Sequence, residues 1–234
     1  MEEFKETPVA IQTENTAARA AFYRQTYTHL ALSVLLFILV EMIFFQIPAV
    51  LELALSLTQG RLWLFMLIGF MIVTSYAERM ALKSHDKSKQ YLALVLFVVA
   101  EAFIFIPLIF MAMMYAGEGG MSIINQAAIM TLSLFSGLSA IVLLTKKDFS
   151  FMKSALAVGF FIALGLIVAG LLFGFDLGLW FSVGMVVLAS GSILYQTSNM
   201  VHKYDNDQYV GASLALFASL MLLFWYLLSI LSRR

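Results

Sequence analysis

The sequence contains no cysteine, and that absence excludes several kinds of site at once. A chain of 234 residues without cysteine has no disulfide, no thiol nucleophile and no thiolate ligand for a metal. Charge is also scarce, because only 12% of the residues are charged, against about a quarter in a soluble domain. With 62% hydrophobic residues the chain cannot cover a water-facing surface. We therefore predict an all-α polytopic membrane protein.

Several function classes lack the residues that they require. Positive and negative side chains balance at 14 each, and no basic stripe carries interleaved aromatics, so we expect no nucleic-acid partner. The three histidines are scattered and none has the spacing of a zinc site, so we expect no metal and no cofactor. No aspartate lies within an apolar segment, and no phosphate-binding glycine loop is present. Nothing in the chain points to an enzyme.

The abundant apolar residues gather into seven segments of about 20 residues, the length at which a helix crosses the hydrocarbon of a bilayer. Because lipid cannot satisfy an open backbone, each segment is predicted to be a helix. The segments run over residues 26–48, 62–82, 91–115, 122–145, 154–175, 177–199 and 209–231. The loops between them are short, so we expect a single seven-helix transmembrane domain over residues 26–234.

The stretch before the first segment, residues 1–25, is predicted to be a cytoplasmic polar tail. Its last part, AARAAFYRQ, is expected to lie as a helix on the membrane surface. Basic residues favour this tail and the even-numbered loops, whereas the odd-numbered loops hold only Arg61. The positive-inside rule then places the N-terminus in the cytoplasm and, after seven spans, the C-terminus outside. Arg233 and Arg234 disagree with that side, so six spans with an incompletely crossing last helix stay an alternative.

An ionisable side chain inside an apolar segment is expensive and marks a functional candidate, and two glutamates stand out there. Glu101 lies about ten residues into the third segment, near the bilayer midplane, where it either lines a pathway or makes a structural hydrogen bond. Glu41 is nearer the outer end of the first segment, and its carboxyl can instead reach the outer interface. Arg79 ends the second segment, as an interfacial anchor or as a partner for an acid at its depth.

The last segment carries small residues four apart, Gly211, Ala215 and Ser219, which let neighbouring helices approach closely. Tyr226 lies two turns further along the same face. This segment is therefore predicted to be surrounded by protein rather than by lipid.

An uncharged polar cluster, SILYQTSNM at residues 192–200, ends the apolar run before the last segment. The longer stretch ASGSILYQTSNMVHKYDNDQYVGASLALFASLMLLFWYLLSIL resembles the C-terminal block of the Bax inhibitor / YccA family of seven-helix membrane proteins. LLTKKDFSFMKSAL resembles the family's basic loop, and YAERMA and FIFIPLIF resemble parts of its second and third helices. The resemblance covers nearly the whole chain beyond the tail.

The resemblance implies a bundle in which the last helix is central and the other six wrap it. It also implies a slow leak of calcium or other cations, linked to ion homeostasis and stress protection. In the calcium-leak members, two aspartates share a proton and form a pH-sensitive latch with an arginine. Here those positions hold Gln196 and Ser219, with Arg79 matching the arginine, so a hydrogen bond would replace the titrating pair. The secondary candidates are Glu41, Asn199 and Tyr226.

Two functions stay open. The first is a cation leak in which Glu101 supplies the remaining carboxylate. The second, implied by the YccA branch, is a non-conducting modulator of a membrane protease such as FtsH. A small-solute transporter has less support, because the two halves show no repeat. The partners expected are the lipid bilayer, calcium or other cations, and an FtsH-type protease, in the bacterial cytoplasmic (inner) membrane. A monomer is compatible with the sequence.

Overall fold

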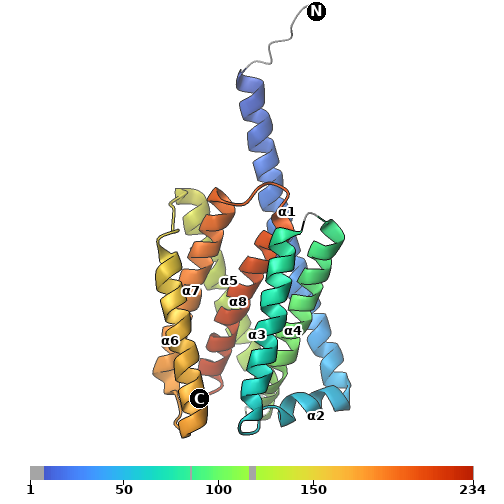
Figure 1. Cartoon of the computed structure of the whole chain (residues 1–234), viewed down its shortest axis with the longest axis vertical. Helices are drawn as coiled ribbons and strands as arrows, with labels where there is room; N and C mark the ends of the chain where they lie inside the picture. Colours follow the sequence, from blue (N-terminus) through green and yellow to red (C-terminus); the bar gives the residue numbers. More distant parts are fainter. Residues whose placement is uncertain (1–7, 85, 116–119, 234) are drawn as a thin grey trace, which may run out of the picture.

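The structure is a computed structural model that describes residues 8–84, 86–115 and 120–233. Within these ranges it contains eight helices and no strand, and all but one of the helices run along the long axis of the molecule (Figure 1). Helices satisfy their own backbone hydrogen bonds, which is what a hydrocarbon environment demands. The helices are α1 (Pro8–Gln46), α2 (Pro48–Ser56), α3 (Leu62–Lys83), α4 (Lys87–Tyr115), α5 (Gly120–Thr145), α6 (Met152–Phe173), α7 (Gly178–His202) and α8 (Tyr209–Leu231).

Seven of the helices in the described ranges, all except α2, are long and apolar enough to cross a membrane. The prediction of an all-α chain with seven spans is therefore confirmed. The last helix, α8, has 23 residues. At 1.5 Å per residue it is about 34 Å long, which exceeds the roughly 30 Å of bilayer hydrocarbon. The alternative in which this helix fails to cross is not supported.

The first span differs from the prediction at its start. We expected a surface helix within residues 1–25, set apart from a span that begins at residue 26. Instead α1 is one unbroken helix, and its N-terminal part projects along the bundle axis beyond the other helices (Figure 1). Phe22 and Thr26 are buried against the bundle, so this stretch packs on protein rather than on the membrane surface.

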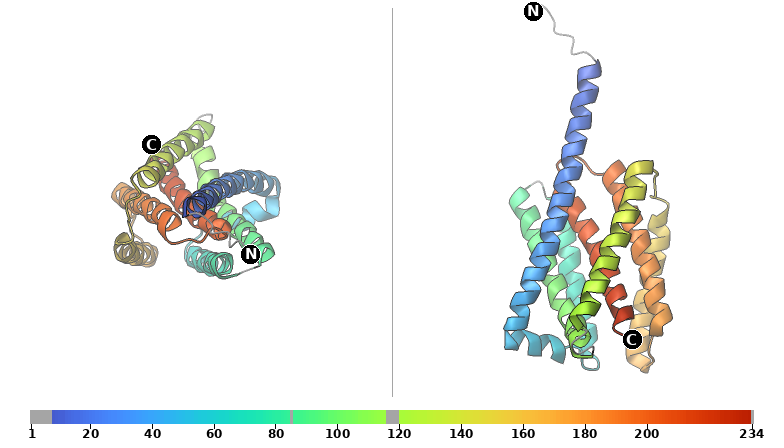
Figure 2. Two further views of the ribbon diagram at one scale, coloured as in Figure 1. Left: turned by 90° about the horizontal axis from the view of Figure 1, so that it is seen from above. Right: turned by 180° about the vertical axis from the view of Figure 1, so that it is seen from behind.

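A short helix, α2, fills part of the stretch 49–61 that we expected to be a loop. Pro48 stands in its first turn, where the missing N–H of proline costs nothing. Ile47 before it is extended, as the residue ahead of a proline prefers to be. α2 lies across the end of the bundle rather than along it, and it packs against α1 and α4 (Figure 2).

The last helix, α8, runs through the middle of the bundle (Figure 2). It packs against α1, α3, α4, α5 and α7, and 17 of its residues are buried. Gly211 shows how close the contact with α3 is, because a Cβ there would lie 2.6 Å from Leu82 Cδ2 and 3.3 Å from the Ala81 carbonyl oxygen. The central position that the resemblance implied for the last helix is thus observed.

The expected wrapping by six helices is incomplete, because α6 stands outside α7. It packs chiefly against α7, and only Ala163 and Gly170 of its residues are buried. The two helices touch through Gly159, where a Cβ would lie 2.6 Å from Leu188 Cδ1. Since α6 contributes little to the shell around α8, a groove is left between α6 and α3.

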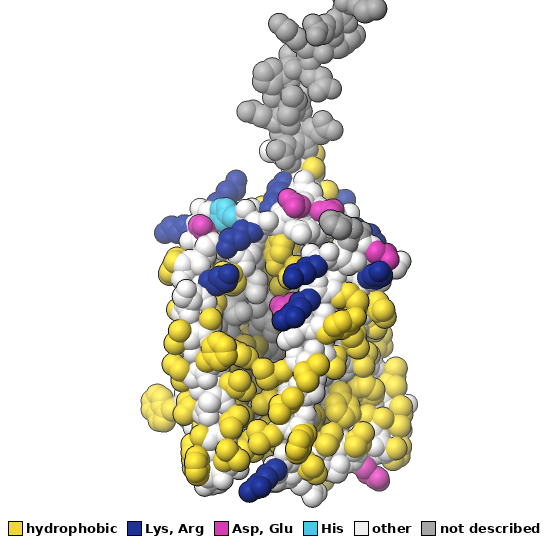
Figure 3. Space-filling model, in the orientation of Figure 1, with side chains coloured by type: hydrophobic (Ala, Val, Ile, Leu, Met, Phe, Trp, Pro, Cys, Tyr) yellow, Lys and Arg dark blue, Asp and Glu magenta, His cyan; other side chains and the backbone are white. Residues whose placement is uncertain are grey.

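Charged side chains gather at the ends of the bundle, with a broad apolar belt between them (Figure 3). On the face that Figure 3 shows, a hollow lies between α3 and the pair α6 and α7, with Lys and Arg side chains around its upper part. Among the described residues, the end opposite the start of α1 holds Arg61 and Arg233. The basic residues at or near the end from which α1 projects are Arg19, Arg24, Arg79, Lys83, Lys87, Lys89, Lys146, Lys147, Lys153 and Lys203.

Candidate functional site

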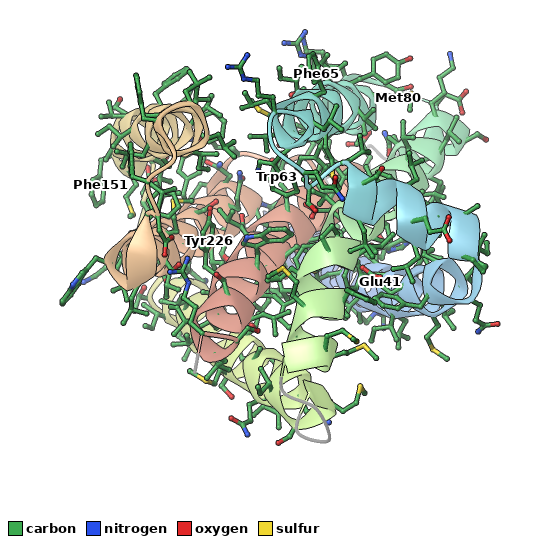
Figure 4. The ribbon with its side chains drawn as sticks, turned by 90° about the horizontal axis from the view of Figure 1, so that it is seen from below. Glu41, Trp63, Phe65, Met80, Phe151 and Tyr226 are labelled. Atoms are coloured by element: carbon green, nitrogen blue, oxygen red, sulfur yellow. The ribbon has the colours of Figure 1, made fainter. Side chains whose placement is uncertain are left out.

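A cavity of about 530 Å³ lies between α3, α4, α6, α7 and α8. It extends along α8 from Arg233, at the exposed C-terminal end, to Ala218 near the middle of that helix. The position of α6 outside α7 leaves the room for it. Figure 4 looks from the C-terminal end of the bundle, where Trp63 of α3 and Tyr226 of α8 border this space.

Glu101 lies in the wall of this cavity at its inner end, midway along α4. The side chain is 7% exposed, and no group in the described ranges forms a hydrogen bond with its carboxyl. Its two carboxyl oxygens are not fully enclosed, unlike those of Glu41, which are enclosed and have no hydrogen-bond partner. The Glu101 carboxyl therefore keeps a small exposed area on the cavity side, at a depth where an unpaired polar group is costly.

Aromatic residues are prominent in the rest of the wall. Trp63 of α3 and Trp225 of α8 stack with their ring centres 6.3 Å apart. Phe105, one turn along α4 from Glu101, points its edge at Trp225 with ring centres 4.9 Å apart. The aromatic residues of the wall are Trp63, Phe70, Phe97, Phe105, Phe175, Phe181, Trp225 and Tyr226. Glu101 is thus the one acidic group at the inner end of this cavity, because the other, Asp176, lies at its exposed end.

An ion pair marks the exposed end of the cavity. Arg233 Nη1 lies 3.5 Å from Asp176 Oδ2, and the two side chains are 39% and 79% exposed. The backbone N–H of Gly178 also donates to Asp176, at 3.0 Å, which fixes the turn between α6 and α7. A pair this exposed contributes little to stability, so the mouth is not locked shut.

Arg79 lies away from this cavity, on the lipid side of α3. It is exposed and forms the end of a second, apolar groove whose walls come from α3 and α6. Leu67 lines both the groove and the cavity, so the two hollows are neighbours. The structure does not bring Arg79 into contact with Gln196 or Ser219 among the hydrogen bonds of the described residues.

The polar cluster of α7 meets α8 one turn deeper than the resemblance implied. Ser219 Oγ is 2.8 Å from Ser192 Oγ and also donates to the carbonyl of Ala215, at 3.1 Å. Gln196 instead accepts a hydrogen bond from Asn199 Nδ2, at 3.3 Å. The expected pair of Gln196 with Ser219 is therefore replaced by Ser192 with Ser219, because the offset between the two helices brings the earlier residue level with Ser219. Neither hydroxyl titrates.

The rest of the cluster holds neighbouring elements in place. Thr197 is 3.4 Å from Ser139 of α5, hydroxyl to hydroxyl. Ser198 accepts from the backbone N–H of Phe149, at 2.9 Å, and donates to Asp148, at 3.3 Å. Ser150, whose backbone N–H donates to Asp148 at 2.8 Å, is the main cause of a lowered pKa at Asp148, and Ser198 adds to it. The cluster thus joins α7 to α5 and to the loop between α5 and α6.

Sequence reasoning missed the role of Arg19. Its guanidinium donates to the carbonyls of Met200, at 2.5 Å, and Val201, at 2.8 Å, and to that of Tyr204, at 2.6 Å. These carbonyls lie at the end of α7, where four have no partner within the helix and the helix dipole is negative. An arginine inside the helical stretch AARAAFYRQ, next to the aromatic Phe22, is the only signal that the sequence offered.

Glu41, a secondary candidate, is buried rather than reaching the outer interface. It is 6% exposed, and both of its carboxyl oxygens are sealed and without a hydrogen-bond partner. Figure 4 shows it on α1, close to where α2 and α4 pass. Asn199 is also buried, with an unpaired Oδ1, and Tyr226 packs edge-on against Phe181. In the described residues no three His, Asp or Glu side chains gather as a metal site would require.

Comparison with known proteins agrees with this architecture. The family described as "Inhibitor of apoptosis-promoting Bax1" matches residues 19–234. An uncharacterized protein of Pseudomonas aeruginosa is 42% identical over 119 residues, 50% of this chain and 53% of that protein. Two Escherichia coli proteins, "Modulator of FtsH protease YccA" of strain K12 and "Inner membrane protein YccA" of strain O6:H1, are each 36% identical over 118 residues, 50% of this chain and 53% of theirs.

The chain spans about half the length of these curated relatives. The family match, by contrast, runs from Arg19 through the central helix α8 to the last residue. The chain therefore belongs to the family of inhibitors of apoptosis-promoting Bax1, the Bax inhibitor family of membrane proteins.

Proposed function

We propose that this protein lets cations leak slowly across the bacterial inner membrane, along a path that includes the cavity and Glu101. The observation that carries the proposal is the unpaired carboxyl of Glu101 at the inner end of a cavity that opens at one end of the bundle. A carboxylate at that depth lowers the cost of bringing a cation into the membrane. The name of one relative, an inner membrane protein, supports the location.

We place the end from which α1 projects in the cytoplasm. The loops at that end carry nearly all of the basic residues, which is the distribution that the positive-inside rule describes. The C-terminus and the mouth of the cavity, with Asp176 and Arg233, then face outward. Cations would enter Glu101's cavity from outside the cell.

The closure of the proposed path lies between the inner end of the cavity and the cytoplasmic end. Ser192 and Ser219 tie α7 to α8 at that depth. Because this pair does not titrate, we expect the closure itself to lack the pH switch of the di-aspartyl members.

The test is calcium flux into liposomes that contain the purified chain, at mildly acidic and mildly basic pH. We expect Glu101→Gln to lose most of the flux, because it removes the charge and keeps the shape. Glu41→Gln is the matched control, since it also neutralises a buried glutamate but one that is sealed off from the cavity. Equal flux in the two variants would remove Glu101 from the path.

A second function, modulation of an FtsH-type protease without conduction, is favoured by two observations. The K12 relative bears the name of an FtsH modulator. The N-terminal part of α1 projects beyond the bundle at the end that we place in the cytoplasm, where a large partner could reach it (Figure 2). Neither function requires a catalytic step, so we propose a protein that is not an enzyme.

The second function is tested by co-purifying the full chain with FtsH and measuring turnover of a protease substrate. Deleting residues 1–15 removes the projecting segment and keeps Arg19, which the bundle needs. We expect the deletion to abolish the effect on turnover. An unchanged effect would place the contact elsewhere on the molecule.

A further inference from the structure

We propose that the aromatic cavity is a binding site for a lipophilic organic cation, a quaternary or protonated amine or its phosphonium analogue, whose charge pairs with Glu101. The site is the one used in the proposed leak, but the inference names a different occupant and does not rest on conduction. The size, the lining, the lone acid and the route of access each support it.

The cavity has the size of a site for an organic molecule. Its volume of about 530 Å³ lies within the range of ligand pockets, which is about 300 to 1,000 Å³. A bare calcium ion requires roughly six to eight oxygen ligands. At its inner end the wall supplies one carboxylate, Glu101, because the other, Asp176, is paired with Arg233 at the mouth. A calcium ion beside Glu101 would therefore have to keep most of its water shell. A cation that brings its own apolar body needs only one charged partner.

The charge of the ligand follows from Glu101. Glu101 is more than nine-tenths buried, lines the cavity and has no hydrogen-bond partner for its carboxyl among the described residues. The other charged groups of the wall, Asp176 and Arg233, are paired with each other at the exposed mouth. An anion at the inner end would meet an unscreened carboxylate, whereas a cation would supply the missing counter-charge.

The aromatic wall favours a cation of organic type over a hydrated metal ion. Trp63, Trp225 and Phe105 form one contiguous aromatic group beside the space that leads to Glu101. The two tryptophans are stacked, and Phe105 lies perpendicular to Trp225. Aromatic faces attract ammonium-type cations, and tryptophan does so best. An alkyl or aryl body on the cation would also remove apolar surface of these rings from water.

The groove between α3 and α6 offers access from the bilayer. Leu67 separates the groove from the cavity and lines both, and α6 is held mainly by α7. A lipophilic cation concentrates in a membrane before it meets any protein. The same property that suits it to the cavity therefore brings it to this entrance.

The test measures binding of tetraphenylphosphonium to the full chain in lipid nanodiscs, with tetraphenylborate as the anion of equal shape. The chain has three tryptophans, and Trp180 is 85% exposed. In a Trp180→Phe background, fluorescence comes from Trp63 and Trp225 alone, which both line the cavity. We expect saturable quenching by the cation and none by the anion.

Glu101→Gln should weaken the cation's binding by about tenfold or more, because it removes the counter-charge. Glu41→Gln should leave binding unchanged, since that carboxyl is sealed away from the cavity. Equal quenching by the two ions, or full binding by a folded Glu101→Gln variant, overturns the proposal. If that variant does not fold, the thermal midpoint of the Trp180→Phe chain decides: a rise with the cation alone supports the site, and no rise overturns it.

The outcome is separable from that of the leak. Binding without calcium flux leaves this inference in place and removes the proposed conduction. Calcium flux that depends on Glu101, without binding of the organic cation, supports the proposed conduction and removes the organic-cation site.

Discussion

Arg19 concentrates more tertiary hydrogen bonding than any other side chain in the described part of the molecule. Its five donors form a planar fork, and the fork fits the group of carbonyls that a helix leaves open at its end. Its position over the rings of Phe22 and Tyr23, at 4.6 and 5.3 Å, holds the fork in place. One residue thereby joins the start of the chain to the connection before the central helix.

Replacing Arg19 should destabilise the bundle. We expect Arg19→Ala to cost about 2 kcal/mol, because several carbonyls at the end of α7 lose a charged donor. Arg19→Lys should cost less, since it keeps the charge near the helix end and loses the fork. Thermal unfolding in detergent measures both, with Arg24→Ala, an exposed arginine five residues along α1, as the control. Equal midpoints for Arg19→Ala and Arg24→Ala would contradict this role.

The loop carboxylate Asp148 gives a prediction for pH. Ser150, through the hydrogen bond from its backbone N–H, and Ser198, through a longer one from its hydroxyl, hold the pKa of Asp148 below the ordinary value of 3.8. Because the unfolded chain lacks these donors, Asp148 stabilises the folded state above that value and loses the effect as the pH falls through the lowered pKa. Asp148→Asn should thus lower the thermal midpoint slightly at neutral pH, and the difference from the native chain should vanish in acid. A difference that persists in acid would assign the effect to shape rather than charge.

At the scale of elements, the packing of α8 depends on small residues at particular contacts rather than on glycine in general. Gly211 lies against Leu82 and the backbone of Ala81, whereas a Cβ at Gly137 of α5 would meet nothing within 4 Å. Glycine therefore permits a close contact between helices at Gly211, whereas at Gly137 no such contact requires it.

Alanine at these two glycines should have opposite effects. Gly211→Ala must push α3 and α8 apart or shift Leu82, and we expect it to cost about 1 kcal/mol. Gly137→Ala should be neutral or stabilising, because alanine is the better helix former and has open space there. Thermal midpoints of the two variants test this, and a loss of the same size in both would mean that α3 and α8 are not in such close contact.

The seven spans could be predicted because the hydropathy of a span is averaged over about 20 residues, so a single polar residue does not hide it. The nine residues of α2 are too few for that sum, and its Pro48 is as typical of a loop as of a first turn. The displacement of α6 could not be predicted, because its residues are as apolar as those of the other spans and do not reveal which neighbour covers them. The partner of Ser219 required the offset between α7 and α8, which the connection over residues 203–208 sets.

The sequence predicted that Glu101 lies deep in a span, but it did not predict the cavity that the residue lines. The depth of Glu101 follows from counting along the segment, and the structure places it midway along α4. The cavity beside it is made by residues from five helices and by the absence of α6 from the shell around α8. A pattern within one segment of the sequence cannot predict a cavity that five helices form together.

At the scale of the whole molecule, the bundle is polarised. One end carries nearly all of the positive charge and the projecting start of α1, and the other carries the mouth of the cavity, α2 and the C-terminus (Figures 1 and 3). The direction of the proposed leak and the proposed partner contact both depend on which end faces the cytoplasm.

A labelling experiment fixes that orientation. Because the chain has no cysteine, a single introduced cysteine reacts without background. We expect Gln59→Cys, in the connection between α2 and α3, to react with an impermeant maleimide added outside intact spheroplasts. Lys203→Cys, in the connection between α7 and α8, should react only after the membrane is opened. The reverse labelling pattern would mean that the molecule has the opposite orientation in the membrane. The proposed path would then open toward the cytoplasm.

The central place of the last helix has a consequence for synthesis. α8 leaves the ribosome after every helix that surrounds it, so the bundle cannot complete its packing until α8 has been made. Until α8, which begins at residue 209, has emerged, Ser192 has no Ser219 to bond and the contact with Gly211 is unmade. Chains that stop before that residue would hold six inserted spans around an empty middle, with their polar hydroxyls turned toward lipid or toward one another. Quality control in the membrane could recognise such chains by that unpaired interior alone.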